Sequence, residues 1–187
     1  MKRGINFIVK SLLLALGLAA DAFSVAFANG MRERAMPYRK SLKIAGVFGA
    51  FQALMPLLGW YFVRGLLNCF AKAAVFLPVL SFCMLNFIGF KMLLQALGPE
   101  NKKAELNKSS LVTEAAATSL DALSAGFAYG EQSLSSALLS SFIIGAVTFT
   151  LSQLGIVLGK KAAAHSAGGA DLAAGIILIF LGFESLV

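Results

Sequence analysis

The feature that most constrains this chain is a twelve-residue segment that occurs twice, one hundred residues apart. The copies are residues 19–30 and 119–130, and six of their twelve positions are identical without a gap. Each copy lies in a long apolar run and carries one aspartate near its middle, Asp21 or Asp121. A carboxylate at the centre of a bilayer costs about 2.5–3.5 kcal/mol even on the mildest insertion scale. A chain that places this costly residue in both copies is expected to use it.

The apolar runs indicate an integral membrane protein. The chain is 58% hydrophobic and 13% charged, whereas a soluble domain is about 25% charged. A spanning helix needs about 20 mostly apolar residues, and the sequence predicts an all-α fold with six transmembrane helices in the lipid bilayer. They are expected over residues 8–29, 44–63, 74–97, 110–130, 137–159 and 168–187. The basic residues lie between these runs, which favours membrane loops and argues against a nucleic-acid partner.

The similarity extends beyond the twelve-residue motif. Residues 48–59 align with 144–155, and residues 87–90 align with 180–183. The two repeats therefore contain three helices each, and because three is odd the second must enter the membrane in the opposite orientation. Inverted repeats of this kind recur in transporters, with the substrate site near the midplane. The predicted units are a first repeat over 1–97, a polar cytoplasmic linker over 98–109 and a second repeat over 110–187.

The basic residues also predict which loops face the cytoplasm. With six helices, the N-terminal side carries five Lys and Arg residues and the opposite side carries ten. Positively charged loops stay inside, so loops one, three and five are expected in the cytoplasm and both termini outside. The N-terminus has features of a signal peptide. However, its apolar run is too long and is interrupted by Asp21, and a second copy lies deep in the chain, so we interpret it as a retained helix.

The two aspartates are the first candidate site residues. Residues three, four and seven apart share a helix face, and around both Asp21 and Asp121 that face consists mostly of small residues that allow close helix approach. Ionisable residues in membranes normally face the bundle interior, so the two carboxylates are expected to face each other. They repel unless a proton or a cation lies between them. The favoured interpretation is a cation site; the alternative is a protonated, purely structural pair.

Oxygen-bearing residues accompany the aspartates. The further candidate ligands are Ser24, Ser124, Thr118, Asn29 and Gln52. In the second predicted helix, Pro56 removes the backbone hydrogen bond to the carbonyl of Gln52, which could leave that residue a free carbonyl beside its amide; a simple kink is the alternative. Ligands that are all oxygen favour hard cations such as Mg²⁺, Ca²⁺ or Mn²⁺. Spacing alone does not separate these ions, and no cofactor is expected.

The other polar residues in or near the helices are weaker candidates. Glu114 lies seven residues before Asp121, about 10 Å nearer the cytoplasmic end of a helix. It is interpreted either as a ligand where the ion enters or, slightly favoured, as an interfacial carboxylate. Lys91 is expected to reach the membrane surface, and Glu184 and His165 are expected to be solvated, the histidine in a loop. The two cysteines, Cys69 and Cys83, have no metal-ligand spacing and are expected to be inert thiols.

These motifs resemble those of the bacterial manganese efflux pump family, MntP. The family's marks are a Met- or Ala-Asp-Ala-Phe motif in helix one and an Ala-Thr-Ser-Ile/Leu-Asp-Ala motif in helix four. Here they read Ala20-Asp21-Ala22-Phe23 and Ala117-Thr118-Ser119-Leu120-Asp121-Ala122. Residues 51–60 and 87–92 resemble its helices two and three, so the similarity covers nearly the whole chain. The lysine exporter superfamily is a more distant relative.

The resemblance implies six helices, a bacterial plasma-membrane location and export of Mn²⁺ as the transported substrate. Many members of the family have glutamate where this chain has Gln52, so the change Gln52→Glu is expected to strengthen ion binding by adding a charge. Three other functions remain open: export of another cation or a small organic solute, a non-transporting membrane scaffold, and an intramembrane aspartyl protease. The protease is disfavoured because neither aspartate lies in a Gly-x-Gly-Asp motif.

Overall fold

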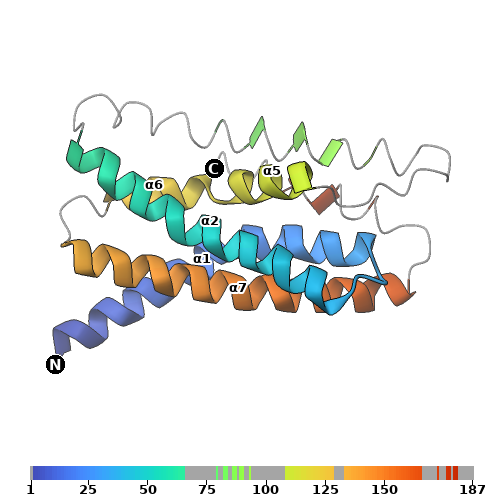
Figure 1. Cartoon of the computed structure of the whole chain (residues 1–187), viewed down its shortest axis with the longest axis horizontal. Coiled ribbons are helices and arrows are strands. Elements are labelled where there is room, and N and C mark those ends of the chain that lie inside the picture. Colours follow the sequence, from blue (N-terminus) through green and yellow to red (C-terminus); the bar gives the residue numbers. More distant parts are fainter. Residues whose placement is uncertain are drawn as a thin grey trace.

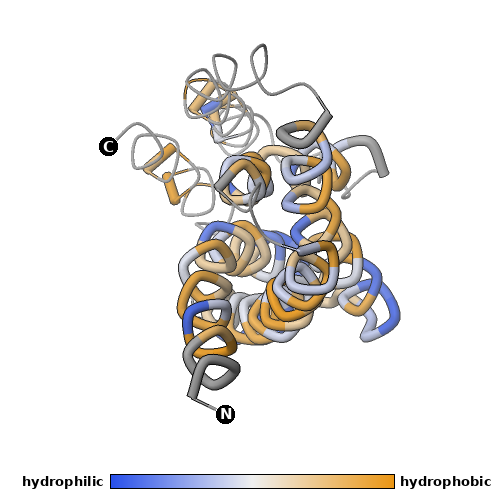
Figure 2. The backbone as a smooth tube through the Cα atoms, turned by 90° about the vertical axis from the view of Figure 1, so that its left-hand side faces the viewer, coloured by the Kyte–Doolittle hydropathy of each residue, from blue (hydrophilic) through white to orange (hydrophobic). Residues whose placement is uncertain are grey.

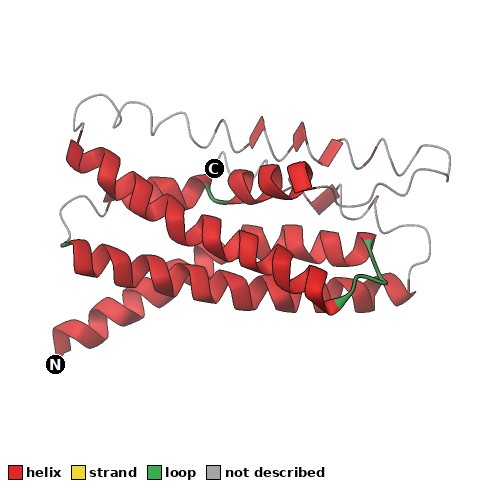
Figure 3. Cartoon of the chain, in the orientation of Figure 1, coloured by secondary structure: helices red, strands yellow, loops and turns green. Residues whose placement is uncertain are grey.

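The structure is a computed structural model that describes residues 2–65, 108–128 and 133–165, with isolated helical positions between 79 and 93 and between 172 and 180. All of its regular elements in these ranges are helices (Figure 3). The expected helices over 74–97 and 168–187, the linker over 98–109, and Cys69, Lys91 and Glu184 lie wholly or largely outside the described residues.

Four helical segments form an elongated bundle (Figure 1). Helices α1 (Lys2–Arg32) and α7 (Leu134–His165) run in one direction. Helix α2 (Tyr38–Gly65) and the consecutive helices α5 (Lys108–Thr118) and α6 (Leu120–Ala128) run in the opposite direction. The main packing partners of α7 are α1 and then α2, and α2 also packs against α6.

Within the described residues, three helices are long and apolar enough to cross a membrane: Phe7–Arg32, Tyr38–Phe62 and Leu134–Ala163. The chain is therefore a multi-pass membrane protein, as its apolar runs predict. The predicted helices over 8–29, 44–63 and 137–159 are each extended at both ends in the structure. His165, expected in a loop, is instead the last residue of α7.

The expected continuous helix over 110–130 is wrong at Ser119, where α5 ends and α6 begins. The Ser119 amide donates to the Ala116 carbonyl at 3.2 Å, the tighter spacing of a 3₁₀ turn. The hydroxyls of Ser119 and Thr118 also donate back to carbonyls three or four residues earlier, at 3.0–3.2 Å. Such side-chain bonds compete with the helical ladder and bend helices, which gives a physical reason for the interruption.

The buried core is built mostly from alanine, with a few large residues such as Phe48 and Ile144, and many other bulky apolar side chains are exposed. Alanines with no exposed surface include Ala15, Ala19, Ala22, Ala26 and Ala28 of α1. Exposed large residues include Leu13, Leu54, Tyr61 and Phe142. The view along the bundle (Figure 2) accordingly shows hydrophobic residues all around the helices rather than only at the centre. Helices that pack through small residues and present large ones outward are typical of a lipid environment.

Glycines bring the helix backbones of α1 and α7 into direct contact. A Cβ added to Gly155 would lie 2.6 Å from the Phe23 carbonyl oxygen, and one added to Gly159 would lie 2.1 Å from that of Phe27. Gly30 on α1 is equally close to the Ile156 carbonyl, at 2.3 Å. Only a residue without a side chain fits such an approach.

The contacts of α2 follow the same principle. An added Cβ on Gly59 would lie 2.3 Å from the Leu123 carbonyl oxygen of α6, and one on Gly126 would lie 2.2 Å from that of Pro56. Pro56 lies inside α2, which continues past it.

Helices α2 and α7 meet at two glycines in a reciprocal contact. An added Cβ on Gly49 would lie 2.9 Å from the Gly145 carbonyl oxygen, and one on Gly145 would lie 2.9 Å from that of Gly49. The two helices therefore cross at these glycines.

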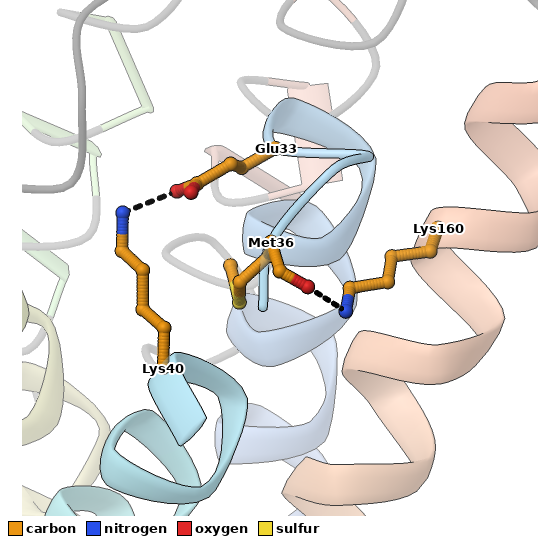
Figure 4. Close-up of polar contacts among 4 residues, drawn as sticks. All are labelled: Glu33, Met36, Lys40 and Lys160. Atoms are coloured by element: carbon orange, nitrogen blue, oxygen red, sulfur yellow. Dashed lines mark hydrogen bonds and ion pairs between the residues drawn. The ribbon is translucent and has the colours of Figure 1, made fainter. Parts of the chain in front are cut away.

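The loop between α1 and α2 is fixed to α7 (Figure 4). Lys160 of α7 donates from Nζ to the Met36 carbonyl at 2.6 Å, and Lys40 forms an ion pair with Glu33 across the loop. Helix α2 begins directly after Pro37, whose carbonyl accepts the amide protons of Lys40 and Ser41. The basic first loop and the basic end of α7 thus lie at the same end of the bundle.

Candidate cation site

The two motif aspartates meet in the structure. Asp21 lies in the middle of α1 and Asp121 in the first turn of α6. Both side chains are partly buried, and their carboxyl groups lie next to each other. Two carboxylates this close repel each other unless a proton or a cation lies between them. The expectation that the two carboxyls face each other agrees with this geometry.

The interruption at Ser119 determines where Asp121 sits. It places Asp121 at the start of a new helix, where the free backbone amides and the helix dipole favour negative charge. Membrane transporters use discontinuous helices in this way, with half-helix ends directed at the substrate. In α1, by contrast, the helix continues through Asp21 without a break.

Gln52 connects the two motif-bearing segments. It is fully buried, and its Nε2 donates to the Leu18 carbonyl of α1 at 3.1 Å and to the Thr118 carbonyl of α5 at 2.8 Å. Leu18 and Thr118 occupy equivalent positions, three residues before Asp21 and Asp121. The Gln52 Oε1 is buried without a hydrogen-bond partner. The Gln52 Nε2 therefore holds the two segments together beside the aspartates, and its Oε1 keeps lone pairs that can accept a hydrogen bond or coordinate an ion.

Asn29 and Glu114 form a second polar contact, between α1 and α5. The Asn29 Nδ2 donates to Glu114 Oε2 at 2.7 Å, and both side chains are almost fully buried. Glu114 is therefore a buried, hydrogen-bonded group in the structure, and its role as a ligand or as an interfacial carboxylate stays a prediction. Because α1 and α5 run in opposite directions, this contact lies about two helical turns from the aspartates, toward the end that carries the α1–α2 loop.

The candidate hydroxyls next to the aspartates hydrogen-bond to their own helices. Ser24 donates to the Ala20 carbonyl at 3.0 Å and Ser124 to the Leu120 carbonyl at 3.4 Å. Both serines are partly buried, whereas Thr118 is almost fully buried. A hydroxyl that donates in this way keeps oxygen lone pairs that can accept or coordinate.

The structure also shows buried polar groups that lie outside the predicted set of ligands. The Oγ1 of Thr148 and the Oγ atoms of Ser141 and Ser152, all on α7, are buried without partners. The alignment of residues 48–59 with 144–155 contained the available signal, because it pairs Thr148 with Gln52 and Ser152 with Pro56.

Among the described residues, no group of three or more His, Cys, Asp or Glu side chains could hold a metal ion. A cation at the aspartates would therefore have two carboxylates and otherwise neutral oxygens in this part of the chain. Cys83 is an exposed free thiol and forms no part of such a group.

Comparison with known proteins identifies relatives along nearly the whole chain. Residues 35–186 match the profile of a family described as "Putative manganese efflux pump". A protein of that name from Methanosarcina mazei is 41% identical over 180 residues, which cover 93% of this chain and 92% of the relative. Another from Saccharophagus degradans is 37% identical, covering 92% and 94%, and one from Bacteroides thetaiotaomicron is 34% identical, covering 94% and 93%.

No solved structure matches the chain. The relatives include archaeal proteins, so the similarity is not confined to bacteria. They are named as efflux pumps, which are transporters and not enzymes. This chain belongs to the MntP family of manganese efflux pumps, as the resemblance in its motifs predicts.

Proposed function

We propose that this protein exports Mn²⁺ from the cytoplasm across the plasma membrane through a mid-membrane site formed by Asp21 and Asp121. The observation that carries the proposal is the contact between these two carboxyls, which come from oppositely directed segments one hundred residues apart. One divalent ion between two carboxylates is charge-neutral. That arrangement minimises the cost of holding a charge in a low-dielectric interior.

A proton and the metal ion are proposed to occupy the aspartate pair in turn, since two apposed carboxylates repel without one of them. With one proton the pair carries a single negative charge, and binding of Mn²⁺ displaces that proton and neutralises the pair. Metal binding to protonated ligands releases protons in this manner. The neutral oxygens of Gln52, Ser24, Ser124 and Thr118 complete the surroundings of the ion.

Asn29 and Glu114 form the approach to the site from the cytoplasm. They lie between the aspartate pair and the end of the bundle that carries the basic α1–α2 loop, the end that the charge distribution assigns to the cytoplasm. The contact between Lys160 and the Met36 carbonyl supports a common side for loops one and five.

The chain is further proposed to consist of two inverted three-helix repeats, over 1–97 and 110–187, joined by a linker over 98–109. The glycine contacts support this arrangement. Gly49 and Gly145 are equivalent positions that touch each other reciprocally. Helix α2 ends and α5 begins at opposite ends of the bundle (Figure 1), which favours an odd number of crossings between them.

A second pair of glycine contacts supports the same symmetry. Gly59 lies against the Leu123 carbonyl of α6, and its counterpart Gly155 lies against the Phe23 carbonyl of α1. Phe23 and Leu123 are themselves equivalent positions in the two copies of the motif. In an inverted repeat, the symmetry operation that relates the two halves also relates these two contacts.

The proposal is tested by manganese export from cells of a manganese-sensitive host that produce the Asp21→Asn or Asp121→Asn variant. Asparagine keeps the size and one oxygen but leaves one positive charge of the ion uncompensated, so export should fall below about a tenth of the parent rate. The control is Glu33→Gln, which removes a carboxylate from the loop and should export normally. Export at the parent rate by either well-expressed aspartate variant would leave the pair a purely structural contact.

A further inference from the structure

Helix α7 buries three hydroxyl groups that have no hydrogen-bond partner: those of Ser141, Thr148 and Ser152. Each of these residues is at most 1% exposed. Burying a hydroxyl without a partner is unfavourable, and unsatisfied groups of this kind in native proteins call for an ion, a water or a functional role.

Other hydroxyls in the same helices solve this problem locally. Thr150, two residues from Thr148, donates to the Ala146 carbonyl at 2.9 Å although it is exposed. Ser24 and Thr118 likewise donate to carbonyls of their own helices. The unpartnered hydroxyls of α7 are therefore a property of one buried face and not of serine and threonine in these helices generally.

That face of α7 extends from its contact with α2 at Gly145 to its contact with α1 at Gly155. Thr148 and Ser152 follow Gly145 by three and seven residues, so the three share one side of the helix. The same side reaches Gly155, which lies against the Phe23 carbonyl of α1. Helices α1 and α7 run in parallel. Ser152 lies about one turn before Gly155 on α7, so it is level with the turn of α1 that precedes the Gly155 contact and contains Asp21.

Gln52 contributes a further buried oxygen, its Oε1, from helix α2, which packs against α7. It follows Gly49 by three residues, just as Thr148 follows Gly145, and these two glycines are in reciprocal contact. Gln52 Oε1 and Thr148 Oγ1 are thus buried, unpartnered oxygens on either side of the crossing of α2 and α7.

We propose that Thr148, Ser152 and the Gln52 Oε1 form a shell of neutral oxygen ligands that replaces part of the water around a divalent cation at the aspartate pair. This inference rests on the proposed function. Hard cations of this kind take about six oxygen ligands and release water reluctantly. Two carboxylates alone do not fill that shell, and the described residues offer no third acidic, cysteine or histidine ligand.

The test compares Thr148→Val and Ser152→Ala with Thr150→Val in the purified full-length protein. Valine has the shape of threonine without its hydroxyl, and Thr150 is the matched control on the same helix. Mn²⁺ binding by calorimetry should weaken about tenfold in the first two variants and stay unchanged in the control. Pulsed paramagnetic resonance of bound Mn²⁺ in ¹⁷O-labelled water should count one additional water ligand in each weakened variant.

A Thr148→Ser variant, which restores the hydroxyl, should recover both the affinity and the parent water count. Parent-like affinity and water count in Thr148→Val and Ser152→Ala would show that these hydroxyls hold only water and would overturn the inference. Equal losses in Thr148→Val and Thr150→Val would overturn it as well, because they indicate a packing effect. An Asp21→Asn arm separates the two ideas: parent-like binding in that variant rejects the proposed function itself.

Discussion

At the scale of single residues, the contacts of Gln52 lead to a different prediction from the one that the sequence suggests. Adding a charge at this position was expected to strengthen ion binding, as glutamate occurs there in many members of the family. In the structure its Nε2 donates to the carbonyls of Leu18 and Thr118. A glutamate offers no amide protons, so it would place an oxygen against two carbonyl oxygens.

We therefore predict that Gln52→Glu lowers stability without the expected gain in Mn²⁺ affinity. Each lost hydrogen bond is worth about 0.5–1.5 kcal/mol, so the melting temperature in detergent should fall by several degrees. The control is Gln153→Glu, which introduces the same carboxylate but breaks no amide hydrogen bond, because the Gln153 Nε2 has no partner. Tighter Mn²⁺ binding with unchanged stability would show that the Gln52 amide does not hold the two segments together.

The proposed exchange of a proton for the ion at Asp21 and Asp121 gives a second prediction at this scale. Mn²⁺ binding should release about one proton per ion near neutral pH. Calorimetry in buffers of different ionisation enthalpy measures that number directly. The release should disappear in Asp121→Asn, and proton uptake or no release in the parent would contradict the displacement of a proton by the ion.

The meeting of Asp21 with Asp121 could be anticipated because the repeat places both on equivalent small-residue faces. The contact between Asn29 and Glu114 could not. It depends on the relative shift of α1 and α5 along the bundle, which is a tertiary property that the repeated motif does not specify. Neither Asn29 nor Glu114 has an identical counterpart in the other copy of the repeat, at Tyr129 or Leu14.

At the scale of elements, the hydropathy pattern predicts the apolar helices but not the interruption at Ser119. Hydropathy over 110–130 is continuous, and serine and threonine are common in membrane helices. The break arises because the Thr118 and Ser119 hydroxyls hydrogen-bond backward while Gln52 of another helix takes the Thr118 carbonyl. Only the last of these is a tertiary contact, and a tertiary contact is what a one-dimensional pattern cannot show.

Close packing of the helices predicts opposite effects for alanine at different glycines. Gly59→Ala and Gly159→Ala would push a Cβ into a backbone carbonyl, so both should lower the melting temperature and the yield of folded protein. Gly17→Ala and Gly46→Ala meet nothing within 4 Å and should be neutral or stabilise by up to about 1 kcal/mol, since alanine favours helix. Thermal unfolding in one detergent compares all four, and similar losses at Gly17 and Gly59 would argue against the helix contacts described.

At the scale of the whole molecule, the structure places the two ends of the described bundle in distinct chemical settings. One end carries the basic α1–α2 loop, bound to α7 through Lys160. The other end carries the start of α7, where Ser133 caps the helix through a bond from the Ser136 amide to its Oγ. Charge counting could assign sides to these loops, but it could not show that loop one and the end of α7 touch, since they are far apart in sequence.

This arrangement predicts opposite accessibility for two exposed positions, Ala35 in the α1–α2 loop and Ser135 at the start of α7. Single cysteines are introduced at each in a background in which Cys69 and Cys83 are serine and manganese export is retained. An impermeant maleimide applied to intact cells should label Ser135→Cys and leave Ala35→Cys unlabelled until the membrane is permeabilised, because basic loops remain inside. The reverse pattern would invert the orientation while preserving the bundle, whereas labelling of both positions from one side would contradict the opposite placement of these two loops.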